Sequence, residues 1–144
     1  MIRIIYTNSD GGARGNPGPG AIGIIVREND QILTKYSQMI GEYITNNMAE
    51  YEALIKALEL ASYHSKEVTS YIDSELVVKQ LLGEYRVRNP RILKLFLRVQ
   101  KLQDRFDKII YKHVRRDDKF QQLADELVNE ELEKHGYKKK FPTG

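Results

Sequence analysis

The chain has 144 residues and no cysteine, which excludes a disulfide framework, a thiol nucleophile and a cysteine-ligated zinc site. Its 23 Lys and Arg residues against 20 Asp and Glu residues give a net charge of +3, which permits nucleic-acid binding without requiring it. The length fits one domain, and no apolar run is long enough for a signal peptide or a membrane span, so we expect a cytoplasmic protein.

The N-terminal part of the chain predicts three strands. Residues 2–8 are apolar and β-branched, which is typical of a buried strand. Residues 21–28 and 31–40 predict an antiparallel hairpin closed by a tight turn at Asn29-Asp30. Between the first two strands, the Gly- and Pro-rich segment 11–20 predicts an irregular loop.

The rest of the chain alternates between helices and strands. In chain order we expect a helix capped by Thr45, a strand over 67–72, a helix capped by Ser74 and ended by Gly83, a helix with Pro90 in its first turn, a strand over 108–114 and a helix over 119–135. The order β-β-β-α-β-α-α-β-α indicates a mixed sheet flanked by helices.

Four carboxylates stand where this topology would bring them together. Asp10 follows the first strand, and Asp73 follows the strand over 67–72. If these two strands are parallel neighbours, both acids lie at the sheet edge where ligands gather in open α/β sheets. Glu50, one turn into the first helix, and Asp125, in the last helix, reach that edge if the helices pack on the sheet.

Four converging acids repel one another unless cations neutralise them. Mg²⁺ is the expected cation, because it prefers oxygen ligands and accepts a few carboxylates together with phosphate oxygens. Each acid alone also has an ordinary explanation: Asp10 as a turn residue, Asp73 as a neighbour of a helix cap, Glu50 and Asp125 as solvent-facing side chains. The residues by themselves leave both explanations open.

Basic residues are concentrated between Lys79 and Arg116. This segment has 12 Lys and Arg residues and three acids, which are Glu84, Asp104 and Asp107. This bias is explained either by a solvated helix face or by a surface that binds phosphates.

Four segments, taken in order, resemble the motifs of the ribonuclease H type 1 family. They are DGGARGNPGPG at 10–20, TNNMAEYEAL at 45–54, IDSELVVKQ at 72–80 and LADELVNEEL at 123–132. The resemblance covers nearly the whole chain. It implies a ribonuclease H-like α/β fold, with a five-stranded mixed sheet of order 3-2-1-4-5, a catalytic domain over 1–135 and a basic tail over 136–144.

The resemblance also implies an activity, a cofactor and a partner. The protein would be a monomeric endoribonuclease that cuts the RNA strand of RNA–DNA hybrids and leaves a 5′-phosphate and a 3′-hydroxyl. Asp10, Glu50, Asp73 and Asp125 would hold two Mg²⁺ ions, with Mn²⁺ as an alternative. The expected substrate contacts are Gly11, Asn16, Thr45, Asn46, Asn47, Ser74 and Glu75, whose polar groups suit 2′-hydroxyls and phosphates.

The chain departs from the family pattern at several positions. Asn8 and Ser9 separate Asp10 from Tyr-Thr, a two-residue shift that keeps the strand alternation. His113 lies in the last strand, so we interpret it as structural, and Gln121 replaces an Asn that is common four residues before the last acid. The loop between them, Arg115 to Lys119, is a partial substitute for the loop histidine of other members.

A basic helix that some bacterial members carry after the second helix is missing here. We therefore interpret four arginines and the run Lys138–Lys140 in the tail as candidate phosphate contacts; the arginines are Arg86, Arg88, Arg91 and Arg116. Two other functions remain open: a related nuclease acting on another duplex, and a protein that binds hybrids without cutting them.

Overall fold

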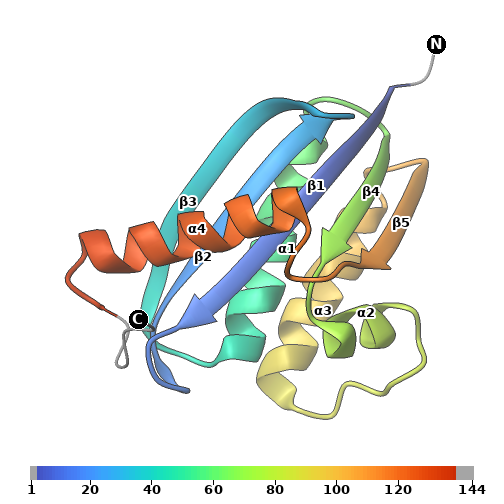
Figure 1. Ribbon diagram of the computed structural model, residues 1–144. Helices are drawn as coiled ribbons and strands as arrows, with labels where there is room; N and C mark the ends of the chain where they lie inside the picture. Colours follow the sequence, from blue (N-terminus) through green and yellow to red (C-terminus); the bar gives the residue numbers. More distant parts are fainter. Residues whose placement is uncertain (1–2, 139–144) are drawn as a thin grey trace.

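The computed structural model describes residues 3–138, which form a five-stranded sheet with helices on both faces (Figure 1). The strand order is β3-β2-β1-β4-β5, as the resemblance implied. The strands are β1 (Ile4–Ala13), β2 (Gly18–Glu28), β3 (Gln31–Ile44), β4 (Glu67–Ile72) and β5 (Lys108–His113).

The pairing of the strands is mixed. β2 pairs antiparallel with both β1 and β3, whereas β4 pairs parallel with both β1 and β5. β1 and β4 are therefore parallel neighbours, which is the condition for Asp10 and Asp73 to lie at the same edge of the sheet.

The helices begin at the residues that the sequence indicated. They are α1 (Asn46–Ala61), α2 (Glu75–Leu81), α3 (Pro90–Gln103) and α4 (Lys119–Lys134). The hydroxyls of Thr45 and Ser74 cap α1 and α2, and Pro90 opens α3. The side chains of Asn89 and Asp118 cap α3 and α4, and each accepts two backbone N–H groups.

The helices divide into two layers. α4 crosses one face of the sheet, and α1 and α3 cover the other (Figure 1). The larger core lies beneath α1, whose Tyr51, Leu54 and Leu58 are fully buried against the sheet and α3. The apolar clusters beneath α4 are smaller, and the polar side chains of Asn8 and Gln121 are buried there.

The prediction of an irregular loop over 11–20 was wrong at both ends. Gly11–Ala13 belong to β1 and Gly18–Gly20 belong to β2, and Ala13 pairs with Gly20. The strand over 31–40 likewise continues to Ile44. Some of the glycines inside these strands are explained by the close approach of a helix backbone, not by a turn of the chain.

Two of these glycines set the positions of the helices. A Cβ on Gly11 would lie 2.2 Å from the carbonyl oxygen of Ala49 in α1. A Cβ on Gly23 would lie 2.4 Å from the carbonyl oxygen of Ala124 in α4. α1 and α4 therefore rest directly on the sheet at the points where Glu50 and Asp125 follow.

A glycine-to-alanine substitution tests this contact, and the chain provides a matched control in the next residue. We expect Gly11→Ala to lower the free energy of unfolding by about 1–3 kcal/mol, the usual cost of overpacking. Gly12→Ala should change it little, because its Cβ would lie 3.6 Å from a Val128 methyl, an ordinary contact. Urea unfolding measures both, and equal effects of the two variants would contradict a specific contact at Gly11.

The domain boundary expected at residue 135 stays a prediction. Tyr137 nevertheless packs against Ala21, Val128 and Leu132, and its carbonyl oxygen accepts a bond from Arg14 Nε (3.3 Å). In the predicted basic run Lys138–Lys140, Lys139 and Lys140 lie outside the described residues. Among the helices of residues 3–138, none is long and apolar enough to cross a membrane.

Candidate active site

Three of the predicted acids meet at the end of β4. Ser9 in β1 pairs with Ile72, the last residue of β4. Asp10 and Asp73 directly follow these two paired residues. Glu50 approaches them from α1. One carboxylate oxygen from each of the three residues lies within 4.8 Å of the others, an arrangement that suits a metal ion.

The position of Glu50 follows from local structure. The Thr45 hydroxyl accepts the N–H of Met48 (3.1 Å) and fixes the start of α1, and Gly11 lets the first turn of the helix approach β1. The Oε2 atom of Glu50 is buried and has no hydrogen-bond partner among the described residues. A buried carboxylate oxygen without a donor is costly, so the site fits a bound cation.

The electrostatics of the site also favour a cation. Burial and the charges of Asp73 and Asp125 raise the pKa of Asp10 to about 8. Burial, followed by the charge of Asp10, raises the pKa of Glu50 well above its usual value. Burial likewise raises the pKa of Asp73. These carboxyl groups resist ionisation because each new negative charge would be poorly solvated and close to other carboxylates.

Asp125 lies beside this cluster but outside the group of three. It is exposed on α4, yet a hydrogen bond with Asp125 is among the causes that raise the pKa of Asp10. Its carboxylate also accepts a bond from Asn129 Nδ2 (3.3 Å). Asp125 therefore lies at the solvent-facing side of the cluster.

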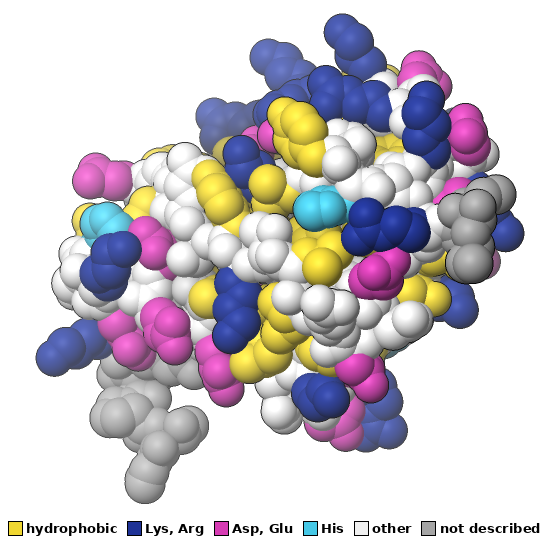
Figure 2. All heavy atoms as spheres, turned by 90° about the horizontal axis from the view of Figure 1, so that it is seen from above, with side chains coloured by type: hydrophobic (Ala, Val, Ile, Leu, Met, Phe, Trp, Pro, Cys, Tyr) yellow, Lys and Arg dark blue, Asp and Glu magenta, His cyan; other side chains and the backbone are white. Residues whose placement is uncertain are grey.

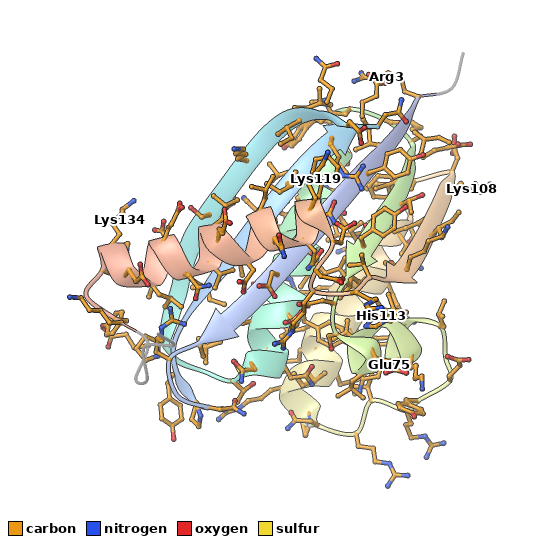
Figure 3. All side chains as sticks on the ribbon, in the orientation of Figure 1. Arg3, Glu75, Lys108, His113, Lys119 and Lys134 are labelled. Carbon is orange, nitrogen blue, oxygen red and sulfur yellow. The ribbon has the colours of Figure 1, made fainter. Side chains whose placement is uncertain are left out.

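Two basic residues border the cluster. Arg116, a predicted phosphate contact, points its Nε at the Asp73 carboxylate at 3.8 Å and counteracts the rise in the pKa of Asp73. His113 ends β5 as predicted, and its Nε2 lies 3.2 Å from the backbone oxygen of Asp73. Figure 3 places His113 beside α2, with Glu75 below it. His113 therefore borders the site, which the sequence did not indicate.

The predicted substrate contacts around α1 form one connected surface. The Asn16 Oδ1 accepts the N–H of Asn46 (2.9 Å), and the Asn46 Oδ1 accepts the N–H of Ala13 (3.1 Å). The two amides thus lock the Gly-rich loop to the start of α1. Thr45 lines an adjacent hollow of about 320 Å³ with Asn89, which was not predicted as a contact, and with Arg91, a predicted phosphate contact.

The other predicted contacts are less closely connected. Ser74 caps α2, and the exposed Glu75 pairs with Lys79 at 3.0 Å. Asn47 is half-buried, and Arg86 and Arg88 are exposed in the stretch between α2 and α3, where residues 82–89 form no helix. Gly11 is buried beneath α1, so packing explains it without any substrate.

Residues outside the predicted set hold Asp125 and α4. Arg14 Nη2 donates to the Asn129 Oδ1 (2.8 Å), which connects the Gly-rich loop to the amide that binds Asp125. The only sequence signal for Asn129 is its position four residues after Asp125, on the same helix face.

Charge is unevenly distributed over the surface. In Figure 2 Lys and Arg side chains gather along the upper side of the view, and acidic side chains are commoner on the lower left. α3 carries no acid and four basic residues: Arg91, Lys94, Arg98 and Lys101. Half of the 12 basic residues of 79–116 therefore lie on one helix face and in the stretch that leads into it.

Known proteins resemble the chain over most of its length. A family model described as reverse transcriptase-like matches residues 8–131. The bifunctional protein Rv2228c of Mycobacterium tuberculosis is 37% identical over 132 residues, 90% of this chain and 35% of the relative. Ribonuclease HI of Halobacterium salinarum is 37% identical over 131 residues, 90% of this chain and 64% of the relative. The chain thus spans about a third and just under two thirds of these relatives.

Solved structures agree with this comparison. The RNase H domain of Rv2228c, solved as a fusion with maltose-binding protein, has a TM-score of 0.85 and 36% identity, covering 92% of this chain and 95% of that one. LC11-RNase H1 in complex with an RNA/DNA hybrid has a TM-score of 0.82 and 42% identity, covering 92% and 97%. The chain therefore belongs to the ribonuclease H type 1 family.

Proposed function

We propose that the protein is a divalent-metal-dependent endoribonuclease that hydrolyses the RNA strand of RNA–DNA hybrids. The observation that carries the proposal is the cluster of Asp10, Glu50 and Asp73, three buried or half-buried carboxylates within 4.8 Å at the end of β4. A relative that is 42% identical has been solved with an RNA/DNA hybrid, which supports this substrate class.

The four acids have a common role in this proposal. Asp10, Glu50, Asp73 and Asp125 hold Mg²⁺, or Mn²⁺ in its place, as two ions per site. When bound, the metal supplies positive charge that stabilises the transition state and activates water. The unpaired Oε2 of Glu50 and the raised pKa of Asp10 support this role. A bound cation would pair with the free oxygen and stabilise the ionised form of Asp10.

The reaction is hydrolysis of a phosphodiester. Water adds to phosphorus, the bond from phosphorus to the 3′ oxygen breaks, and that oxygen leaves with a proton. The products are a 5′-phosphate and a 3′-hydroxyl. Arg116, on the rim beside Asp73, is placed to attract the scissile phosphate to the site.

Recognition of the hybrid involves the surface around α1. Since the Oδ1 atoms of Asn16 and Asn46 accept backbone N–H groups, their Nδ2 groups are the ones that would contact 2′-hydroxyls. Thr45, Asn47, Ser74, Glu75 and the Gly11 backbone complete the proposed contact surface. Arg86 and Arg88, together with the basic start of α3 at Arg91, would hold phosphates of the duplex. We further propose that the protein acts as a monomer in the cytoplasm.

Matched substrates of one sequence test the proposal. A labelled RNA strand is annealed to DNA or to RNA, and a DNA duplex completes the set. We expect Mg²⁺-dependent cleavage of the hybrid at least about 100-fold faster than of either duplex, because the 2′-hydroxyl contacts and the groove shape both select the hybrid. Fragments that a polymerase extends carry the expected 3′-hydroxyl. Equal cutting of double-stranded RNA would favour the related-nuclease alternative, and hybrid binding without cutting would favour the binding protein.

A further inference from the structure

Two departures from the family pattern, Asn8 and Gln121, meet in the structure. The Asn8 Nδ2 donates to the Gln121 Oε1 (3.2 Å), and the Gln121 Nε2 donates to the carbonyl oxygen of Ser9 (2.8 Å). Both side chains are fully buried between β1 and the first turns of α4. Buried amides are costly unless their groups are paired, so each of these residues depends on the other.

A third residue completes the pairing. The Arg27 Nε donates to the Asn8 Oδ1 (2.9 Å), and its guanidinium lies 4.2 Å from the centre of the Phe120 ring in α4. The guanidinium thereby contacts both β1 and the residue next to Gln121. The start of α4 is attached to the sheet by directional bonds and not only by apolar contacts.

The geometry relates this pair to the acids. Asn8 stands two residues before Asp10 on the same face of β1, a step of about 6.7 Å. Gln121 stands four residues before Asp125 on one face of α4, a step of about 6 Å. α4 runs from Lys119 across the sheet to Lys134 (Figure 3). The Asn8–Gln121 bond therefore lies one step back from Asp10 along β1 and one step back from Asp125 along α4.

We infer that Asn8 and Gln121 are a positioning pair, which fixes the position of α4 over β1 and so holds Asp125 against Asp10. The inference deepens the proposed function, on which it rests. Neither amide belongs to the four acids of the proposed site, so the pair acts through the position of Asp125. Without the pair, α4 would still be held where Ala124 lies on Gly23 and by the Arg14–Asn129 bond, but its first turns would lose their hydrogen bonds to β1.

The test is Gln121→Leu, which keeps the size of the side chain and removes both amide bonds. We expect Mn²⁺ affinity, measured by calorimetry without substrate, to fall by about 10-fold, the lower range for losing a partner that orients a metal ligand. In cleavage assays kcat should fall while KM for the hybrid stays unchanged. Gln122→Leu makes the same substitution at the next, exposed position of α4 and should leave Mn²⁺ affinity unchanged.

A second background separates positioning from general damage. In Asp125→Asn protein, Gln121→Leu should cause no further loss of Mn²⁺ affinity, because its effect passes through Asp125. The same loss in both backgrounds, or no loss in either, would overturn the inference. If Gln121→Leu does not fold, Gln121→Asn takes its place; it should also lower Mn²⁺ affinity, because the shorter amide does not span to Asn8.

The outcomes also separate the inference from the proposed function. A wild-type protein that binds Mn²⁺ but cuts no hybrid would refute the function, and the calorimetric comparison of the variants would still decide the positioning role. A wild-type protein that binds no Mn²⁺ would overturn both.

Discussion

Replacing Asp10 or Asp73 with asparagine is expected to abolish cleavage of the hybrid while its binding survives. Asparagine keeps the shape of the side chain but removes a negative ligand from a cluster whose oxygens lie within 4.8 Å. The loss of kcat should exceed about 100-fold, the upper range for losing an outer partner of a metal ligand. A labelled hybrid in Mg²⁺ buffer measures cleavage, and fluorescence anisotropy in EDTA measures binding.

Binding should be equal or tighter in both variants, because one negative charge beside the phosphates is gone. In Asp73→Asn the guanidinium of Arg116 also loses its carboxylate partner and becomes free for the substrate. Asp30→Asn, in the exposed turn between β2 and β3, is the control for the loss of one charge. Near wild-type cleavage by both site variants would show that the assigned acids are wrong.

Asp125→Asn should cause a smaller loss than either. Asp125 is exposed and lies outside the group of three, so its contribution depends on how α4 is held. The chain also departs from the family pattern before this acid, since the loop lacks the histidine of other members and Gln121 replaces the common asparagine. The structure adds a physical reason, because its orientation depends on the amide of Asn129.

The sequence predicted the fold well where a local signal and the global arrangement agree. Thr45, Ser74 and Pro90 marked helix starts because capping is a local property of a few residues. The Gly-rich segment gave a wrong prediction because only local signals were used. Gly11 is typical of a turn locally, but in the structure it is explained by Ala49, which lies far along the chain.

The site was predictable as a set of acids but not as a set of contacts. Alternation along β1 and the parallel pairing with β4 sufficed to expect Asp10 beside Asp73. The pairing of Asp73 with Arg116, and of Asn8 with Gln121 across 113 positions, depends on how a loop and a helix pack. No periodicity encodes such contacts, because they join elements whose relative position only the folded chain defines.

The second large effect is a loss of stability with rising pH in metal-free buffer. The pKa of Asp10 is raised from 3.8 to about 8 in the folded protein, so the folded state holds a proton that the unfolded state releases. Stability therefore falls as pH rises between these two values. The contribution of the cluster is on the order of a few kcal/mol, since one pKa unit corresponds to about 1.4 kcal/mol.

Asp10→Asn should flatten this slope and be more stable than wild type at pH 8, because the neutral amide never has to ionise. Asp30→Asn should keep the wild-type slope. Urea unfolding at several pH values in EDTA measures all three proteins. Parallel curves for wild type and Asp10→Asn, or a less stable Asp10→Asn at pH 8, would mean that the carboxylates are not strained in the metal-free protein.

Adding Mg²⁺ should reverse the pH effect in the wild type. A ligand that binds only the folded state stabilises it more the more tightly it binds, and the cation binds best when Asp10 and Glu50 are ionised. The stabilisation by Mg²⁺ should thus be small at pH 5, large at pH 8 and weak at both in Asp10→Asn. The repulsion that destabilises the metal-free protein is then also the source of its affinity for the cation. Burial keeps water away from the carboxylates, so their charges are not neutralised until a metal ion binds.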